Sequence, residues 1–274
     1  MTFREATTQA AANVNKRDAE LLLAHILQCD RVYLAAHFDD PLTPDQQATF
    51  NTLIARRAAH EPLQYILGHQ EFYGLDFRVT PAVLIPRPET EHLVEAVLLW
   101  ATRFHDERLL HIADVGTGSG AIAIALATHL AGATFISTDI SEAALAIARE
   151  NAETHGCEDR IQFLHRDLLP PETRFDAIVS NPPYVPAADA ATMQPEVVHH
   201  EPHTALFAGP DGLDVYRRLI PAAQAALNPE GLLALEIGYG QRDALTELLT
   251  GWNNIRFIDD YQGIPRTVLA HRPA

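Results

Sequence analysis

A glycine-rich segment reads Asp114-Val115-Gly116-Thr117-Gly118-Ser119-Gly120 and lies between an apolar run and a helical pattern. The apolar run, residues 109–115, is typical of a buried strand, and residues 121–130 have the composition of a buried helix. Glycines at such a junction let the backbone approach a ligand closely, beside the N-terminus of the helix. The segment therefore predicts an α/β fold with a ligand site at the end of a strand.

Strand and helix patterns alternate along the rest of this part of the chain. We expect further strands at residues 134–138, 161–164, 177–180 and 232–237, and helices at residues 142–154 and 213–227. An earlier helix is marked by Leu93, Val97, Trp100 and Phe104. Such alternation is typical of a parallel sheet with helices on its faces.

The N-terminal part has a different pattern. Residues 16–28 carry apolar side chains at helical spacing, and residues 44–60 form a second predicted helix with Thr43 as its cap. Residues 69–80, around Gly74, predict a short hairpin. We therefore expect a helical-bundle domain at residues 1–68, a hairpin linker at 69–85 and the α/β domain at 86–274.

Acidic residues end the next two predicted strands. Asp139 lies about 20 residues after the glycines, where a carboxylate accepts hydrogen bonds from both ribose hydroxyls of a nucleoside. Asp167 is expected to face an adenine amino group, with Leu168 packed on the ring. Asp139 is also explained as a helix cap before Ser141, and Asp167 as part of a turn. The glycine segment alone equally fits a nicotinamide dinucleotide or a turn with no ligand.

The tetrapeptide Asn181-Pro182-Pro183-Tyr184 follows a predicted strand and favours methyl transfer over hydride transfer. Its prolines stiffen the backbone, so nearby carbonyls become fixed acceptors. The Asn181 side-chain carbonyl and the Pro182 backbone carbonyl together can accept both hydrogens of an NH₂ group, and Tyr184 offers a flat face to a planar group. The expected reaction is transfer of a methyl group from S-adenosylmethionine to an amide or amine nitrogen.

The chain of 274 residues has 20 Lys and Arg against 36 Asp and Glu, a formal net charge of -16. No cluster of basic residues is present to neutralise phosphates, which disfavours stable nucleic-acid binding and favours a basic protein partner. The two cysteines, Cys29 and Cys157, have no metal or redox spacing. No signal peptide or membrane span is evident, so we expect a cytoplasmic protein.

Histidines gather around one acidic residue in the sequence His199-His200-Glu201-Pro202-His203. Such a cluster raises the possibility of a metal site. Exposed histidines are common in a proline-containing loop, and the expected chemistry needs no metal. We therefore expect none.

The sequence resembles the PrmC or HemK protein-(glutamine-N5) methyltransferases, which modify peptide chain release factors. The resemblance runs through nearly the whole chain, and the stretch Ile85-Pro86-Arg87-Pro88-Glu89-Thr90-Glu91 is specific to the family. The other motifs are Arg17-Asp18-Ala19-Glu20, Glu61-Pro62 before Tyr65, Glu71-Phe72-Tyr73-Gly74-Leu75, the glycine-rich segment, Asn181-Pro182-Pro183-Tyr184, Glu201-Pro202 with Ala205-Leu206, and Glu236-Ile237-Gly238.

The resemblance implies a Rossmann-like, seven-stranded class I methyltransferase domain, preceded by a helical domain that helps hold the protein substrate. The substrate would be the glutamine of the Gly-Gly-Gln loop in class I release factors. By position, Gly116 to Gly120 and Asp139 would hold S-adenosylmethionine, and Asn181 would bind the glutamine amide. Arg87 and Pro88 would lie near the mouth of the cofactor site.

Three other functions remain open from the residues themselves. An adenine-N6 methyltransferase of DNA or RNA would use the same tetrapeptide, with Tyr184 stacked on a flipped base, although the acidic charge disfavours it. A nicotinamide oxidoreductase would leave Asn181 to Tyr184 without a role. A sensor that binds an adenosyl ligand without catalysis would be distinguished by a turnover assay.

Overall fold

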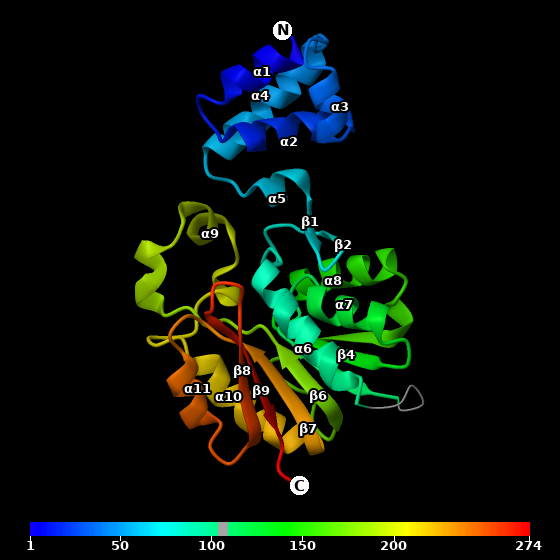
Figure 1. Cartoon of the computed structure of the whole chain (residues 1–274), viewed down its shortest axis with the longest axis vertical. Coiled ribbons are helices and arrows are strands. Elements are labelled where there is room, and N and C mark those ends of the chain that lie inside the picture. The colour runs from blue at the N-terminus through cyan, green and yellow to red at the C-terminus, as the bar shows by residue number, and fades with distance from the viewer. Residues whose placement is uncertain (104–108) are drawn as a thin grey trace. The chain divides into compact units, whose positions relative to one another are not determined.

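The computed structural model describes residues 1–103 and 109–274 (Figure 1). The chain divides into two compact units. The first comprises Met1–His69 together with Gln194–His200, and the second comprises Gln70–Met193 together with Glu201–Ala274. Each unit has its own apolar core.

The first unit is helical, as the sequence predicts. Its helices are α1 (Phe3–Ala10), α2 (Lys16–Leu27), α3 (Arg31–Ala36), α4 (Pro44–Ala58), α5 (Leu63–Leu67) and α9 (Pro195–His200). Thr43 caps α4, because its hydroxyl accepts a hydrogen bond from the Gln46 amide in a capping box. Leu22, Leu23 and Phe50 are buried at the centre of this bundle.

Helix α9 joins this unit from a distant part of the sequence. The Arg57 side chain donates to Asp18 at 2.8 Å and to Glu196 of α9 at 2.7 Å, and one guanidinium nitrogen also reaches the Glu61 carbonyl. The two carboxylates make the pKa of Arg57 higher than usual, although burial of the guanidinium opposes this effect. The cluster attaches α9 to α2 and α4 within the unit.

The second unit contains a seven-stranded sheet in the described residues, with the strand order β5-β4-β3-β6-β7-β9-β8. The strands are β3 (His111–Val115), β4 (Thr134–Asp139), β5 (Ile161–His165), β6 (Phe175–Ser180), β7 (Leu227–Glu236), β8 (Asn253–Asp259) and β9 (Pro265–His271). Strands β3 to β7 confirm the predicted parallel core of the sheet. Strand β9 is antiparallel to both β7 and β8.

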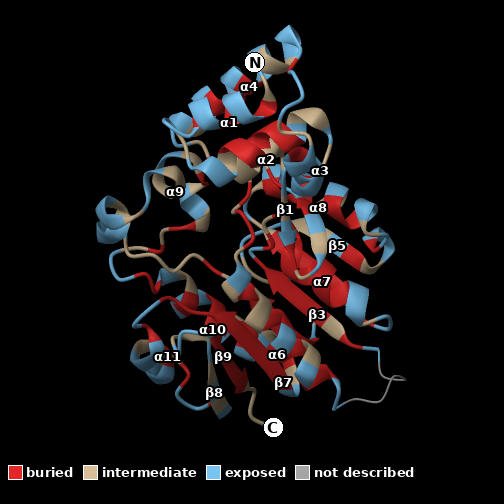
Figure 2. Ribbon diagram, turned by 45° about the horizontal axis from the view of Figure 1, so that its top comes forward, coloured by how far each residue is buried: buried red, intermediate tan, exposed pale blue. Residues whose placement is uncertain are grey.

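Helices cover both faces of this sheet (Figure 2). They are α6 (Glu91–Ala101), α7 (Ala121–His129), α8 (Glu142–Thr154), α10 (Asp214–Ala226) and α11 (Arg242–Leu248). One core lies against α6 and α7, and the other against α10 and α11. Short 3-10 helices are η1 (Pro88–Thr90), η2 (Glu158–Arg160), η3 (Ala187–Thr192) and η4 (His203–Ala205). Phe104, predicted to extend the helix before the sheet, lies outside the described residues.

The predicted hairpin is confirmed as β1 (His69–Phe72) and β2 (Leu75–Arg78). Phe72 and Phe77 are fully buried and pack into the core beside α6 and α7. Across residues 1–103 and 109–274, no helix has both the length and the apolar character needed to span a bilayer.

The order of the sheet places a crevice between β3 and β6. From β3 the chain proceeds to β4 and β5 on one side, and then returns to β6 and β7 on the other. At such a reversal, the loops after two neighbouring strands diverge and leave room for a ligand. The glycine-rich segment follows β3, and Asn181 follows β6. The Ser180 hydroxyl donates to the Val115 carbonyl at 2.6 Å and joins these two strand ends.

Candidate functional site

A cavity of about 310 Å³ lies in the second unit, at the carboxyl ends of β3, β4 and β6. This volume falls within the usual range for small-molecule sites. The lining residues include Leu84, Gly116, Gly118, Asp139, Leu168 and Asn181. Motifs far apart in the sequence therefore meet at one site.

Gly116 and Gly118 form part of the cavity wall, and a Cβ at either position would meet no atom within 4 Å. Both have positive φ, 74° and 57°, which glycine adopts without strain. Their amide groups are already used: Gly116 donates to the Thr138 carbonyl and Gly118 to Asp139. The two glycines thus leave space for a ligand to come close to the backbone, but their amide groups are not free to donate to it.

Thr117, Ser119 and Gly120 do not line the cavity. The Thr117 hydroxyl donates to Asp114 at 2.6 Å, and the Ser119 carbonyl accepts from Asn151 at 2.8 Å. A Cβ on Gly120 would lie 2.8 Å from the Ile124 side chain of α7 itself and 3.3 Å from the Ala148 side chain, so this glycine lets the start of α7 lie close to α8. These three residues hold the segment in shape, and their predicted contact with a cofactor stays a prediction.

Asp139 lines the cavity and also supports its walls. One carboxylate oxygen accepts from the Gly118 amide at 2.9 Å, and the other from the Ser141 amide at 2.8 Å. Burial raises the pKa of Asp139, while these amide hydrogen bonds lower it. Because a carboxylate oxygen can accept more than one hydrogen bond, capping and ligand binding are compatible roles.

Asp167 and Leu168 lie on the same wall. The Asp167 carboxylate accepts from Arg218 of α10 at 2.6 Å, an ion pair that the sequence pattern did not reveal. Leu168 has a φ of 59° and packs partly against the core beneath α10. The cavity edge at this point therefore combines an apolar side chain with a paired carboxylate.

Asn181, Pro182 and Pro183 line the cavity next to the glycine wall. The Asn181 Nδ2 donates to the Thr90 hydroxyl at 3.0 Å. In the described residues, neither Asn181 Oδ1 nor the Pro182 carbonyl has a hydrogen-bond partner. Two acceptors are thus available beside the cavity.

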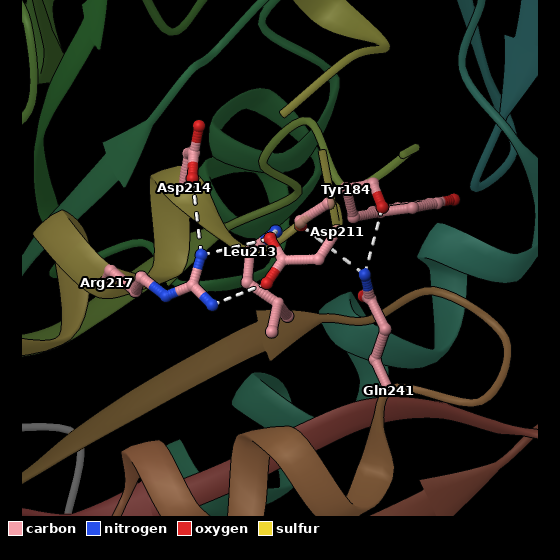
Figure 3. A network of polar contacts seen from close by, with 7 residues as sticks. Tyr184, Asp211, Leu213, Asp214, Arg217 and Gln241 are labelled. Carbon is pink, nitrogen blue, oxygen red and sulfur yellow. Dashed lines mark hydrogen bonds and ion pairs between the residues drawn. The ribbon is translucent and has the colours of Figure 1, made fainter. Parts of the chain in front are cut away.

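Tyr184 is not one of the residues that line this cavity. Its hydroxyl donates to Glu236 at 3.1 Å. Its carbonyl accepts from Gln241 Nε2 at 3.0 Å, as Figure 3 shows. A Cβ on Gly238 would lie 3.0 Å from the Tyr184 ring, and one on Gly212 would lie 2.2 Å from the Tyr184 carbonyl oxygen. The glycines and Gln241 thus fix both the ring and the backbone of Tyr184, whose stacking on a substrate remains a prediction.

Arg87 pairs with the buried carboxylate of Glu201, whose other oxygen accepts from the Ile85 amide. Neither Arg87 nor Pro88 lines the cavity, although Leu84, close to them in sequence, and Pro202, which follows Glu201, do. Pro88 begins η1, which brings Thr90 under Asn181. Arg87 thus holds Glu201, the neighbour of the cavity-lining Pro202, and the position of Arg87 and Pro88 near the mouth of the cofactor site stays a prediction.

The histidines near Glu201 are dispersed in the structure. His199 and His200 lie in α9, in the first unit, whereas His203 packs edge-on against Phe207 in the second. In the part of the chain that the structure describes, no three His, Cys, Asp or Glu residues are arranged to hold a metal ion.

Two buried residues behind the site escaped the sequence analysis. Thr90 is 4% exposed and Glu236 is 1% exposed, and the threonine hydroxyl donates to the carboxylate at 2.6 Å. Both lie in motifs that carry the family resemblance, and a glutamate at the end of an apolar strand is itself unusual. The position of Glu236 at the end of an apolar strand could therefore have marked it as a candidate site residue in the sequence.

Two family models match the chain. Residues 3–68 match the PrmC N-terminal domain, and residues 92–206 match the methyltransferase small domain.

Known proteins resemble the chain over most of its length. It is 45% identical to the release factor glutamine methyltransferase of Koribacter versatilis, covering 100% of this chain and 99% of that protein. The enzyme of the same name from Geobacter sulfurreducens is 48% identical, over 92% of this chain and 87% of the relative. A structure of the T. thermophilus 16S rRNA N2 G1207 methyltransferase with AdoMet and guanosine has a TM-score of 0.55 and 21% identity, covering 74% of this chain and 49% of that one. At this identity, the structural match shows the fold alone.

Proposed function

This chain belongs to the release factor glutamine methyltransferases, and we propose from this that it methylates a release factor glutamine with S-adenosylmethionine as the donor. The accepting atom is the side-chain amide nitrogen, N5, of the glutamine in the Gly-Gly-Gln motif of class I release factors. The observation that carries this assignment is the pair of acceptors, Asn181 Oδ1 and the Pro182 carbonyl, beside the cavity. A primary amide has two N–H groups to match them.

The open glycine wall and the carboxylates that line the cavity support S-adenosylmethionine as its ligand. Gly116 and Gly118 leave open space where a side chain would stand, and the Asp139 carboxylate lies at the distance along the chain expected for a ribose contact. Leu168 and Asp167 provide an apolar face and a polar edge for the adenine. When bound, this cofactor supplies an electrophilic methyl group on a sulfonium.

The protein activates a weak nucleophile by holding it. The lone pair of an amide nitrogen is delocalised into its carbonyl, so the nitrogen reacts poorly in water. Acceptance of both N–H groups by Asn181 and Pro182 increases electron density on the nitrogen and fixes its direction of approach. No strong general base is needed, because the alkylated nitrogen loses a proton readily.

The acidic charge of the chain supports a protein substrate over a nucleic acid. With 36 acidic residues against 20 basic ones, the surface repels phosphates and attracts basic protein surfaces. The helical first unit is the proposed recognition element for the release factor, supported by the match of residues 3–68 to the PrmC N-terminal domain. Deletion of residues 1–68 is expected to abolish methylation of the intact protein while cofactor binding persists.

Mass spectrometry of a purified release factor tests the function directly. Incubation with the enzyme and an isotopically labelled methyl donor should add one methyl group to the glutamine side chain of the Gly-Gly-Gln motif. DNA and RNA containing adenine serve as parallel substrates. Methylation of adenine without methylation of glutamine would overturn the proposal.

A further inference from the structure

A buried chain of hydrogen bonds connects Asn181 to a carboxylate outside the cavity. Asn181 Nδ2 donates to Thr90 Oγ1 at 3.0 Å, and Thr90 Oγ1 donates to Glu236 Oε2 at 2.6 Å. The other carboxylate oxygen, Oε1, accepts from the Tyr184 hydroxyl at 3.1 Å. One carboxylate at the end of β7 therefore connects to both ends of the tetrapeptide that starts at Asn181.

The direction of these hydrogen bonds follows from the number of protons available. An ionised carboxylate only accepts, and a threonine hydroxyl has a single hydrogen to donate. Because Thr90 gives that hydrogen to Glu236, it can only accept from Asn181. The Asn181 amide must then present its NH₂ to Thr90, which leaves Oδ1 on the opposite side of the amide group.

The opposite orientation of the amide would remove the substrate acceptor. Oδ1 would face the lone pairs of Thr90 Oγ1, and the NH₂ group would take the place of the acceptor. Two N–H donors, one from Asn181 and one from the substrate amide, would then oppose each other. The hydroxyl at residue 90 thus decides whether residue 181 accepts or repels an amide nitrogen.

We propose that Thr90 and Glu236 are positioning residues for methyl transfer: Glu236 orients the Thr90 hydroxyl, and Thr90 orients the Asn181 amide with its oxygen toward the substrate nitrogen. This inference rests on the proposed function. The Glu236 carboxylate also holds the Tyr184 ring in place, because it accepts a hydrogen bond from the Tyr184 hydroxyl. Neither Thr90 nor Glu236 lines the cavity.

A double-mutant cycle on kcat tests the path through Asn181. Thr90→Val keeps the shape and removes the hydroxyl, and we expect about a tenfold loss of kcat with little change in cofactor affinity. In an Asn181→Ala background, Thr90→Val should cause no further loss, because the group that it orients is absent. Equal losses in both backgrounds would show that Thr90 acts only through general structure and would overturn the proposal.

Two further variants separate orientation from packing. Thr90→Ser retains a hydroxyl and should recover most of the turnover that Thr90→Val loses. Thr128→Val removes a hydroxyl of α7 that donates to the Ala125 carbonyl at 2.8 Å and does not line the cavity, so it should leave kcat unchanged. Failure of Thr90→Ser to recover turnover, in an enzyme that thermal unfolding shows to be folded, would contradict the proposal.

The pH profile of kcat tests the carboxylate. Burial raises the pKa of Glu236 to about 7, against the effects of Thr90, Tyr184 and Arg266, which lower it, while Glu89 raises it further. Protonation removes one acceptor, so kcat should fall as the pH falls through about 7. Glu236→Gln cannot titrate and should lack this acid limb; an unchanged limb in this variant would remove Glu236 from the proposed role.

The control for the underlying function is the wild-type enzyme. If wild type fails to methylate the release factor, the proposed function fails before any variant is compared. If wild type is active and Thr90→Val is equally active, the function stands and the positioning role is wrong.

Discussion

Replacement of Gly212 by alanine should lower kcat, although Gly212 does not line the cavity. Gly212 has a φ of 75°, and a Cβ there would lie 2.2 Å from the Tyr184 carbonyl oxygen and 2.8 Å from Gln241 Nε2. The nearest obstacle is backbone, which cannot rotate away as a side chain can. The added methyl group must therefore displace the loop that carries Tyr184.

The size of the displacement follows from the contact distance. Carbon and oxygen atoms in favourable contact are about 3.3 Å apart, so the Tyr184 carbonyl must move by about 1 Å from its position at 2.2 Å. Misplacement of catalytic groups by about 1 Å can cost about a hundredfold in rate. We expect a loss of kcat of that order, with about 1–2 kcal/mol of destabilisation from the positive φ itself.

Gly251→Ala is the matched control. Gly251 has a φ of 88°, but a Cβ at this position would meet nothing within 4 Å. It should share the backbone strain of Gly212→Ala while retaining wild-type kcat. Urea unfolding measures the stability of both variants, and labelled methyl transfer to a release factor measures their turnover. Equal turnover by the two variants would refute the argument that the Gly212 contact positions Tyr184.

Three further substitutions test other parts of the site. Asn181→Ala should lower kcat about a hundredfold and change cofactor affinity less, because an acceptor in the transition state is lost; near-normal turnover would remove this residue from the mechanism. Asp139→Ala should weaken S-adenosylmethionine binding by about 1–3 kcal/mol, measured by calorimetry, and an unchanged affinity would leave Asp139 only its bonds to the Gly118 and Ser141 amides. Burial raises the pKa of Asp114 from 3.8 to about 7, so the folded state binds this proton more tightly and wild-type stability should fall as pH rises from about 4 through about 7. Asp114→Asn should show a smaller fall in urea unfolding over that range, and parallel curves for the two proteins would exclude Asp114 as the cause.

The parallel core of the fold follows well from the sequence because its strands are continuous apolar runs. Strands β3 and β6 are almost wholly buried, and their positions hold apolar or small residues except at His111, Asp114 and Asp176. The resemblance implied seven strands, as the sheet has in the described residues, but the residue pattern did not locate the two strands of the antiparallel edge. Strand β8 is mostly exposed or half-buried, and β9 has only a short fully buried run from Thr267 to Ala270. Half-buried strands give weak periodic signals.

The sequence predicted those site residues that belong to short local motifs at strand ends. The glycine segment, Asp139 and Asn181 meet at the cavity, as expected from strand ends at one edge of a parallel sheet. The contact between Thr90 and Glu236 spans 146 residues, and no local pattern indicates which buried hydroxyl will meet which carboxylate. The same limit applies to Thr117 and Ser119, since their motif does not reveal which of its side chains line the cavity.

Helix α9 belongs to the first unit but lies after β6 in the sequence, so this unit cannot be completed before β6 is translated. Arg57 is translated before β3 to β6. Its partner Glu196 follows 139 residues later, after those strands. Until then the nascent bundle carries a guanidinium with only part of its final set of acceptors. The helices of residues 1–68 are therefore translated before β3 to β6, but the unit that they form is completed after them. Its completion waits for translation of the same loop that begins at Asn181.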